Sequence, residues 1–174
     1  MKLVANRCVR RPPTPCDAES IARHVGNRAV SINLRDRVPY PYAVADAVRW
    51  IGSSQGQDPV TSLIIDVDGA AVGGIGLVLG TDIERISAEL GYWLGEEYWG
   101  RGIATAAIRR ICEYGFGDLG LVRIFALPMG HNVASQRVLE KAGFNREGIL
   151  RKACIKDGKI LDEVMYAKIE GEMA

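Results

Sequence analysis

The stretch Glu89-Leu-Gly-Tyr-Trp-Leu-Gly-Glu-Glu-Tyr-Trp-Gly-Arg-Gly-Ile-Ala-Thr105 decides the fold of this chain. Residues 86–94 are strand-like and too few for a typical helix, whereas apolar residues after Gly102 recur at helical spacing, at positions 103, 107, 108 and 111. A helix that begins in this way presents unpaired N–H groups at its positive end, which can bind a phosphate. The stretch therefore predicts a strand, an anion-binding turn and a helix over 102–115.

The glycines of this turn support the same interpretation. Gly100 and Gly102 carry no Cβ, so the backbone can approach a ligand closely, and Arg101 adds a cation beside the expected phosphates. Gly73-Gly-Ile-Gly76 also resembles a dinucleotide-binding motif, but no helix of suitable period follows it. Those glycines are instead expected to ease strand packing or twist.

Composition narrows the class of protein. The chain has 174 residues with a net charge of +1, 48% hydrophobic and 25% charged residues, as in ordinary globular proteins, and nothing indicates a nucleic-acid partner. No apolar run approaches a membrane span, and the N-terminus lacks a signal-peptide pattern. The cysteines are scattered, so we expect free thiols, no metal site and a cytoplasmic location. His24 and His131 are single imidazoles that we expect at the surface.

Hydrophobic periodicity and turn residues predict the order of the elements. We expect strands over 8–11, 62–67, 70–79, 86–94, 122–127, 144–150 and 161–169, and helices over 18–25, around 46–51, over 102–115 and over 132–142. An extended loop is expected over 35–42, where prolines alternate with tyrosines. This order predicts one α+β domain over 1–174, with a mixed, mostly antiparallel sheet of about seven strands and helices on both faces.

Four blocks of residues, in this order, resemble a known family. They are Glu89–Trp93, Tyr98–Thr105, Asn132–Phe144 and Glu147–Arg151, and Pro39–Tyr42 adds to the likeness. The chain resembles the GCN5-related N-acetyltransferases (GNAT), and within them the branch of the ribosomal-protein-serine and ribosomal-protein-alanine N-terminal acetyltransferases. The resemblance implies a sheet in which the parallel strands 86–94 and 122–127 splay apart.

The resemblance further implies acetyl-CoA as co-substrate, without a metal, and a pantetheine arm lying between the splayed strands. Main-chain groups of residues 92–94 are expected to be unpaired there, and Asn132 resembles the family's pantetheine-binding residue. Trp99 stands where the family often has Arg or Gln, which removes the usual side-chain contact at that position. The expected cofactor-binding residues are Tyr92, Trp93, Leu94, Trp99, Gly100, Arg101, Gly102, Ile103, Ala104, Thr105, Asn132 and Ser135.

The resemblance also suggests catalytic residues, each with an alternative. Glu89 is a candidate general base for the acceptor amine, or simply a solvated strand residue. Ser135 is a candidate acid for the departing thiolate, or it bonds its own helix backbone. The N–H of Leu94 or of a neighbour is a candidate oxyanion donor. Tyr40, Tyr42 and Asp162 are the candidate substrate-binding residues, and each could instead serve packing or a turn.

The acceptor is expected to be a primary amine. A lysine with a pKa of about 10.4 costs roughly 4–5 kcal/mol to neutralise at pH 7, and an α-amine with a pKa of about 8 costs only about 1 kcal/mol. This difference favours the α-amine of a protein N-terminus. A small-molecule amine as acceptor and a non-catalytic acyl-CoA-binding or sensing domain stay open as alternatives, as does a homodimer, which related enzymes often form.

Overall fold

The computed structural model describes residues 3–5 and 8–172 of the chain. The strands are β1 (Leu3–Ala5), β2 (Cys8–Arg11), β3 (Ser62–Val67), β4 (Ala70–Leu79), β5 (Ser87–Leu94), β6 (Arg123–Ala126), β7 (Asn145–Lys156) and β8 (Lys159–Ile169). The α-helices are α1 (Ala18–Val25), α2 (Arg28–Ser31), α3 (Val44–Ser54), α4 (Ile103–Gly117) and α5 (Val133–Lys141). Short 3₁₀ turns lie at Pro15–Asp17, Asp82–Glu84 and Glu96–Tyr98.

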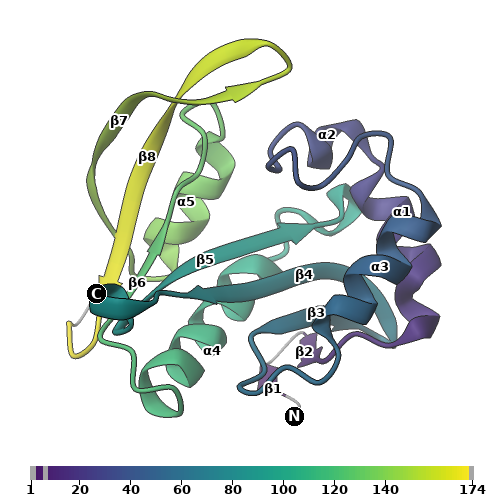
Figure 1. Cartoon of the computed structure of the whole chain (residues 1–174), viewed down its shortest axis with the longest axis horizontal. Coiled ribbons are helices and arrows are strands. Elements are labelled where there is room, and N and C mark those ends of the chain that lie inside the picture. Colours follow the sequence, from purple (N-terminus) through teal and green to yellow (C-terminus); the bar gives the residue numbers. More distant parts are fainter. Residues whose placement is uncertain (1–2, 6–7, 173–174) are drawn as a thin grey trace.

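The strands form one mixed sheet, as predicted. Within the described residues it has eight strands in the order β1-β2-β3-β4-β5-β6-β8-β7, one more than the seven expected, because Leu3–Ala5 adds an edge strand. The pairs are antiparallel except for β5 and β6, which run parallel. In Figure 1 β6 lies toward the left, next to β5 and β8, where the N-terminal and C-terminal halves of the sheet meet.

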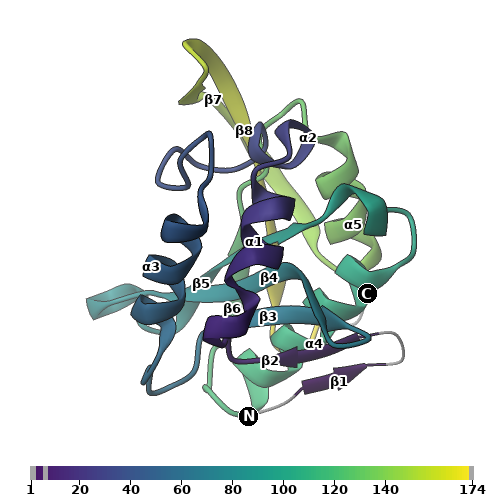
Figure 2. The same ribbon diagram turned by 90° about the vertical axis from the view of Figure 1, so that its right-hand side faces the viewer.

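Helices pack on both faces of the sheet, also as predicted. On one face, Ile103, Ala107 and Ile111 of α4 join a large core with Leu90 and Ile124 of the central strands. On the other face, α1 and α3 form a smaller core against β3 and β4, through Ile21, Ala47, Ile51, Ile64 and Ala71. Figure 2 shows α1 and α3 on this second face.

The second face is covered unevenly. The smaller core reaches Ile64 of β3 and Ala71 of β4, and Trp93 at the end of β5 packs against it. In Figure 1 the helices α1 and α3 lie beside the β3–β4 end, whereas the broad surface of β5, β6 and β8 extends away from them. The exposed Val78 of β4 lies beside this surface, where it pairs with Glu89 of β5. The face therefore offers a place for a ligand beside the central strands.

Several local predictions need correction. The C-terminal hairpin is longer than expected, because residues 151–156 and 159–160 extend β7 and β8 up to the Asp157-Gly158 turn despite their charged side chains. The short helix α2 was not predicted. His24 is buried at 5% exposure rather than lying at the surface, because its ring packs edge-on against Tyr98.

Gly74 of β4 carries a packing constraint. A Cβ built on Gly74 would lie 2.4 Å from Nε1 of Trp93, so the indole lies directly over this glycine. Trp93 pairs with Gly74 across the two strands and packs against the smaller core. The glycine cluster of β4 therefore serves strand packing, in agreement with the sequence-based expectation.

We expect a Gly74→Ala change to lower the free energy of unfolding by about 1–3 kcal/mol, because the Trp93 indole must move out of its packed position. Gly91→Ala is the matched control, since Gly91 is also a strand glycine but has no atom within 4 Å of an added Cβ. Urea denaturation of both variants measures the difference. Equal effects would contradict this account of Gly74.

Candidate functional site

The parallel strands β5 and β6 part soon after they meet. Their register pairs Ser87 with Arg123, Ala88 with Ile124, and Glu89 with Phe125. Beyond that point β5 stays paired with β4 as far as Leu94, and Gly95 N–H continues this pairing to the Val72 carbonyl at 2.8 Å. The chain after β6 instead follows β8, where Pro128 accepts from Val164 and Gly130 donates to Asp162. Each strand keeps its outer partner, so a split opens between them.

Hydrogen-bonded residues alternate along the β4–β5 pair. Gly80 donates to Ser87 and Gly95 donates to Val72, which places the odd-numbered residues of β5 in the hydrogen-bonded positions toward β4. The main-chain groups of Tyr92 and Leu94 therefore point to the split. The expectation that the main chain of Trp93 is unpaired is wrong. Trp93 is an odd-numbered residue of β5, so its main-chain N–H and carbonyl groups point to β4.

The N-terminus of α4 lies just beyond the end of β5. Gly100 and Gly102 have φ angles of +73° and +76°, in the left-handed region that favours glycine, and both are exposed. The first hydrogen bond of the helix joins Ala106 N–H to the Gly102 carbonyl, so the N–H groups of residues 103–105 have no partner inside the helix. Ile103 is buried in the large core, which fixes this end of the helix. Such an end can bind a diphosphate through its amides.

The side chains of this turn have local partners. Trp99 Nε1 donates to the Leu94 carbonyl at 2.8 Å, which uses one of the main-chain groups at the split and ties the turn back to β5. The Arg101 guanidinium lies 5.2 Å from the centre of the Tyr98 ring. Trp99 therefore shapes the turn, and Arg101 supplies a positive charge next to the helix N-terminus.

A hydroxyl pair joins β5 to α5 across the split. The Oη of Tyr92 and the Oγ of Ser135 are 2.6 Å apart, and Asn132 Oδ1 accepts from the Ser135 N–H at 3.1 Å as the N-cap of α5. Burial raises the pKa of Tyr92 to about 12, so the phenol stays protonated at neutral pH. Sequence reasoning considered only the main chain of Tyr92. Side chains alternate along a strand, and Tyr92 is two residues from the buried Leu90. This spacing was the signal that the Tyr92 side chain faces the same side as Leu90, toward α4 and α5.

Glu89 lies on the opposite face, at the last register pair before the split. One of its carboxylate oxygens accepts from Arg35 Nη2 at 2.6 Å, and its side chain is 24% exposed. Arg35 comes from the segment after α2, at the start of the loop that the sequence predicted over 35–42. The structure therefore brings Glu89 beside a cation that sequence reasoning missed, and no pattern in the sequence pointed to it.

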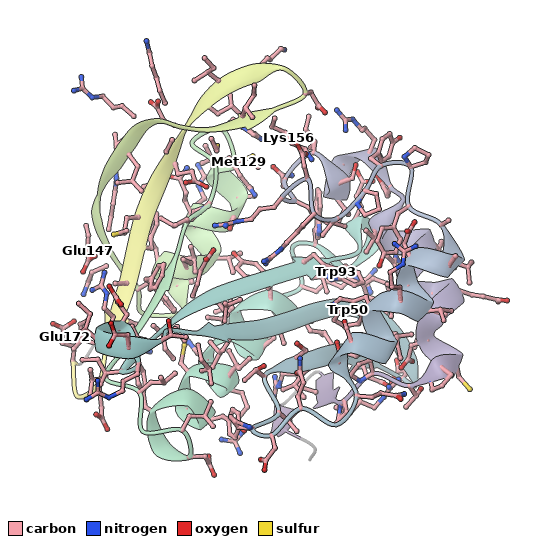
Figure 3. All side chains as sticks on the ribbon, in the orientation of Figure 1. Trp50, Trp93, Met129, Glu147, Lys156 and Glu172 are labelled. Carbon is pink, nitrogen blue, oxygen red and sulfur yellow. The ribbon has the colours of Figure 1, made fainter. Side chains whose placement is uncertain are left out.

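The same region of the chain is tied to three other elements. Besides the Arg35–Glu89 pair, Asn33 contacts His131 Nε2 at 3.1 Å, Asp36 accepts from the buried Lys156 at 2.7 Å, and Arg28 pairs with Asp157. We call residues 28–36 the strap. In Figure 3 Lys156 lies at the end of the β7–β8 hairpin that faces α2, where its contact with Asp36 joins the hairpin to the strap.

The three candidate substrate residues are not brought together by their recorded contacts. Tyr40 is half exposed, with the Arg28 guanidinium 5.0 Å from its ring centre. Tyr42 packs against the smaller core, and burial raises its pKa. The Asp162 carboxylate accepts from the Lys152 N–H at 2.8 Å, at an irregularity of β7, while its carbonyl bonds Gly130 just before α5. Their role in substrate binding stays a prediction.

Helix α1 supports the turn between β5 and α4 from behind. An added Cβ on Gly95 would lie 2.5 Å from His24 Nδ1, so the imidazole fits directly under the turn. Asn27 Nδ2 donates to Glu96 at 2.8 Å and Arg23 pairs with Glu97. Burial and the nearby Arg23 lower the pKa of His24, although Glu97 opposes this shift. A neutral His24 is therefore part of the folded turn.

Comparison with known proteins agrees with this geometry. Residues 7–145 match the model of the acetyltransferase (GNAT) domain. The chain belongs to the GNAT family. It is 34% identical over 122 residues to the uncharacterized N-acetyltransferase p20 of Bacillus licheniformis, an alignment that covers 70% of this chain and 68% of p20. It is 32% identical over 98 residues to the ribosomal-protein-serine acetyltransferase of Escherichia coli, covering 55% of this chain and 54% of that protein.

A solved structure extends the likeness to the fold. Mycobacterium smegmatis RimJ, in complex with CoA-disulfide, superposes with a TM-score of 0.86 at 23% identity, covering 98% of this chain and 88% of that chain. This chain, as a member of the GNAT family, is an acetyl-CoA-dependent N-acetyltransferase. Among residues 3–5 and 8–172, no group of three or more metal-ligating side chains lies together, and no helix is long and apolar enough to cross a membrane.

We expect Gly102→Glu to weaken coenzyme A binding at least 100-fold, which corresponds to roughly 2.7 kcal/mol, because a carboxylate would face the diphosphate at the helix N-terminus. Gly120→Glu is the matched control: Gly120 also has a positive φ, +64°, with no atom within 4 Å of an added Cβ, but it lies beyond the far end of α4. Isothermal titration measures both. Loss of binding in both variants, or in neither, would contradict the placement of the diphosphate.

The folded protein should lose stability on acidification through His24. Its pKa is lowered by folding, so below about pH 6.5 the unfolded chain binds the proton more readily and the folded state loses stability as the pH falls. Between pH 7.5 and 5.5 the wild-type Tm should fall by roughly 2–4 °C more than that of a His24→Gln variant. His131→Gln, at an exposed histidine, should retain the wild-type response. Parallel curves for wild type and His24→Gln would refute this role.

Proposed function

We propose that this acetyltransferase acts on the α-amine of a protein or peptide N-terminus. The observation that carries the proposal is the position of Glu89, at the last register pair of β5 and β6, on the face opposite α4 and α5. A thioester that enters the split from the α4 side would meet an amine beside the Glu89 carboxylate. An α-amine needs only about 1 kcal/mol to become neutral at pH 7, so a single carboxylate suffices as its base.

In this proposal the amine nitrogen attacks the thioester carbonyl directly and Glu89 takes its proton, either directly or through one water. The N–H groups of Tyr92 and Leu94 point to the split, where they can stabilise the negative charge that develops on the carbonyl oxygen. Binding both reactants at the same split supplies proximity and orientation. The Arg35 contact holds the Glu89 side chain in place.

The leaving thiolate needs a proton, and we expect the Tyr92–Ser135 pair to give it. The two hydroxyls are 2.6 Å apart, and the phenol, with a pKa of about 12, retains its proton at neutral pH. Ser135 lies at the start of α5, three residues after Asn132, whose side-chain NH₂ is not used by its N-cap bond. We assign Asn132 to a pantetheine amide and the hydroxyl pair to the sulfur.

One relative supports a protein as acceptor. It is the ribosomal-protein-serine acetyltransferase of Escherichia coli. A small amine is the second candidate, since the exposed acceptor side also admits one.

The test is acetyl-CoA-dependent thiol release across a panel of acceptors. Peptides with a free α-amine and no lysine should react, whereas the same peptides with a blocked N-terminus and one internal lysine should react at least 100-fold more slowly at pH 7. Turnover with small amines alone would replace the proposal by the second candidate. Turnover with the blocked lysine peptides would contradict the α-amine assignment.

Glu89→Gln should lower kcat/KM by about 10²–10⁴-fold and leave coenzyme A affinity unchanged, because it removes the general base without touching the cofactor side. Glu113→Gln is the matched control, since Glu113 also pairs with an arginine, Arg110, but on the outer surface of α4. Steady-state kinetics with a free-α-amine peptide measure both. A Glu89→Gln enzyme of wild-type activity would rule Glu89 out as the base.

A further inference from the structure

A hollow of about 340 Å³ adjoins Glu89 on the open half of the second sheet face. Val78 of β4, Phe125 of β6 and Met165 of β8 line it, together with Glu84, Glu89 and Arg123. A larger hollow, of about 380 Å³, lies between α4, α5 and β8 on the other face, and its lining includes neither Glu89 nor Phe125. The smaller hollow is thus directly continuous with the proposed acceptor site.

The register of the strands places the apolar side chains on one face. Val78 pairs with Glu89 in the β4–β5 ladder, and Phe125 pairs with Glu89 in the β5–β6 ladder, so all three side chains point to the same side of the sheet. Phe125 pairs with Ala167, two residues from Met165, which keeps Met165 on that side as well. The floor of the hollow is therefore apolar and ends at the carboxylate of Glu89.

The charges at the rim favour a cationic ligand. Glu84 is exposed, and no ion pair is recorded for it among the described residues. Arg123, the cation of the lining, is bound by the Glu147 carboxylate, with Nη1 2.7 Å from Oε1, and its guanidinium lies 5.9 Å from the Phe125 ring centre. Its charge is thus paired by Glu147, and the charge of Glu89 is paired by Arg35. Glu84 is the charged side chain of the lining without an ion pair among the described residues, so the rim favours a cation over an anion.

We infer that this hollow is a subsite for the first side chain of the acceptor, and that it selects N-termini whose first residue is large and apolar. This inference rests on the proposed function. With the α-amine beside Glu89, the side chain on the adjacent carbon reaches over Val78, Phe125 and Met165. Burying a leucine side chain there removes apolar surface from water, whereas a glycine gains nothing. The uncovered sheet face leaves room for the rest of the peptide.

The kinetic test compares two peptides that differ only in a first residue of leucine or glycine. The wild-type enzyme should show a kcat/KM at least tenfold higher for the leucine peptide. Val78→Ser, an uncharged polar change at a side chain that is already 52% exposed, should reduce this ratio below threefold. Ile83→Ser, at another exposed apolar residue outside the hollow, should retain the ratio. Equal rates for both peptides in the wild type, or an unchanged ratio in Val78→Ser, would overturn the inference.

A second measurement does not need turnover. The ¹³C-methyl resonance of Met165, assigned with a Met165→Leu variant, is followed with coenzyme A present while each peptide is added. A shift with the leucine peptide and none with the glycine peptide supports the subsite, even if no peptide is acetylated and the proposed function fails. No shift with saturating leucine peptide overturns it. A shift that depends on protein concentration without peptide would show a second copy of the chain on this face and would also overturn it.

Discussion

The early end of the β5–β6 pairing determines the rest of the site. A parallel pair in the middle of a sheet normally continues until one strand ends, but here β5 follows β4 and the chain after β6 follows β8. The split leaves main-chain groups of Tyr92 and Leu94 without a neighbouring strand. Because α4 begins beyond the end of β5 and α5 follows β6, two helix N-termini lie at this opening. One opening therefore joins the cofactor side of the sheet to the acceptor side.

The two sides of the opening are supported by different parts of the molecule. Helix α1 supports the turn before α4 through the buried His24 and through the Arg23–Glu97 pair, and Asn27, which follows α1, contacts Glu96. The strap, residues 28–36, instead joins Glu89, the start of α5 and the β7–β8 hairpin on the acceptor side. The proposed acceptor side and the proposed phosphate-binding turn therefore rest on different contacts. This separation fits a family whose members share acetyl-CoA.

Much of the fold followed from local signals in the sequence. The helix after Gly102 and the hairpin around Asp68-Gly69 were predictable because apolar spacing and turn residues act over a few positions. The turn at Gly100 and Gly102 was predicted from its glycines and from the helix that follows, and the positive φ angles of both residues explain why glycine stands there. The long C-terminal hairpin was missed in part because its outer half carries charges that hide the alternation of a strand.

The remaining features depend on contacts between distant residues. Arg35 and Glu89 are 54 positions apart, and nothing near Arg35 in the sequence indicates that its guanidinium reaches β5. Tyr92 and Ser135 are 43 positions apart. Predicting their contact would have required knowing which face of β5 lies against α5. The main-chain direction of Trp93 was mispredicted because it depends on the alternation of bonds with β4, which a single strand sequence does not contain.

The central claim is that the main-chain amides of residues 103–105 bind the diphosphate of coenzyme A while the pantetheine arm lies in the split. Amide ¹H–¹⁵N shifts followed during titration with coenzyme A, and separately with pantetheine, test it most directly. The account predicts large shifts at residues 103–105 with coenzyme A only, and shifts at Tyr92 and Leu94 with both. Unchanged amides at 103–105 with saturating coenzyme A, or equal shifts there with pantetheine, would contradict it.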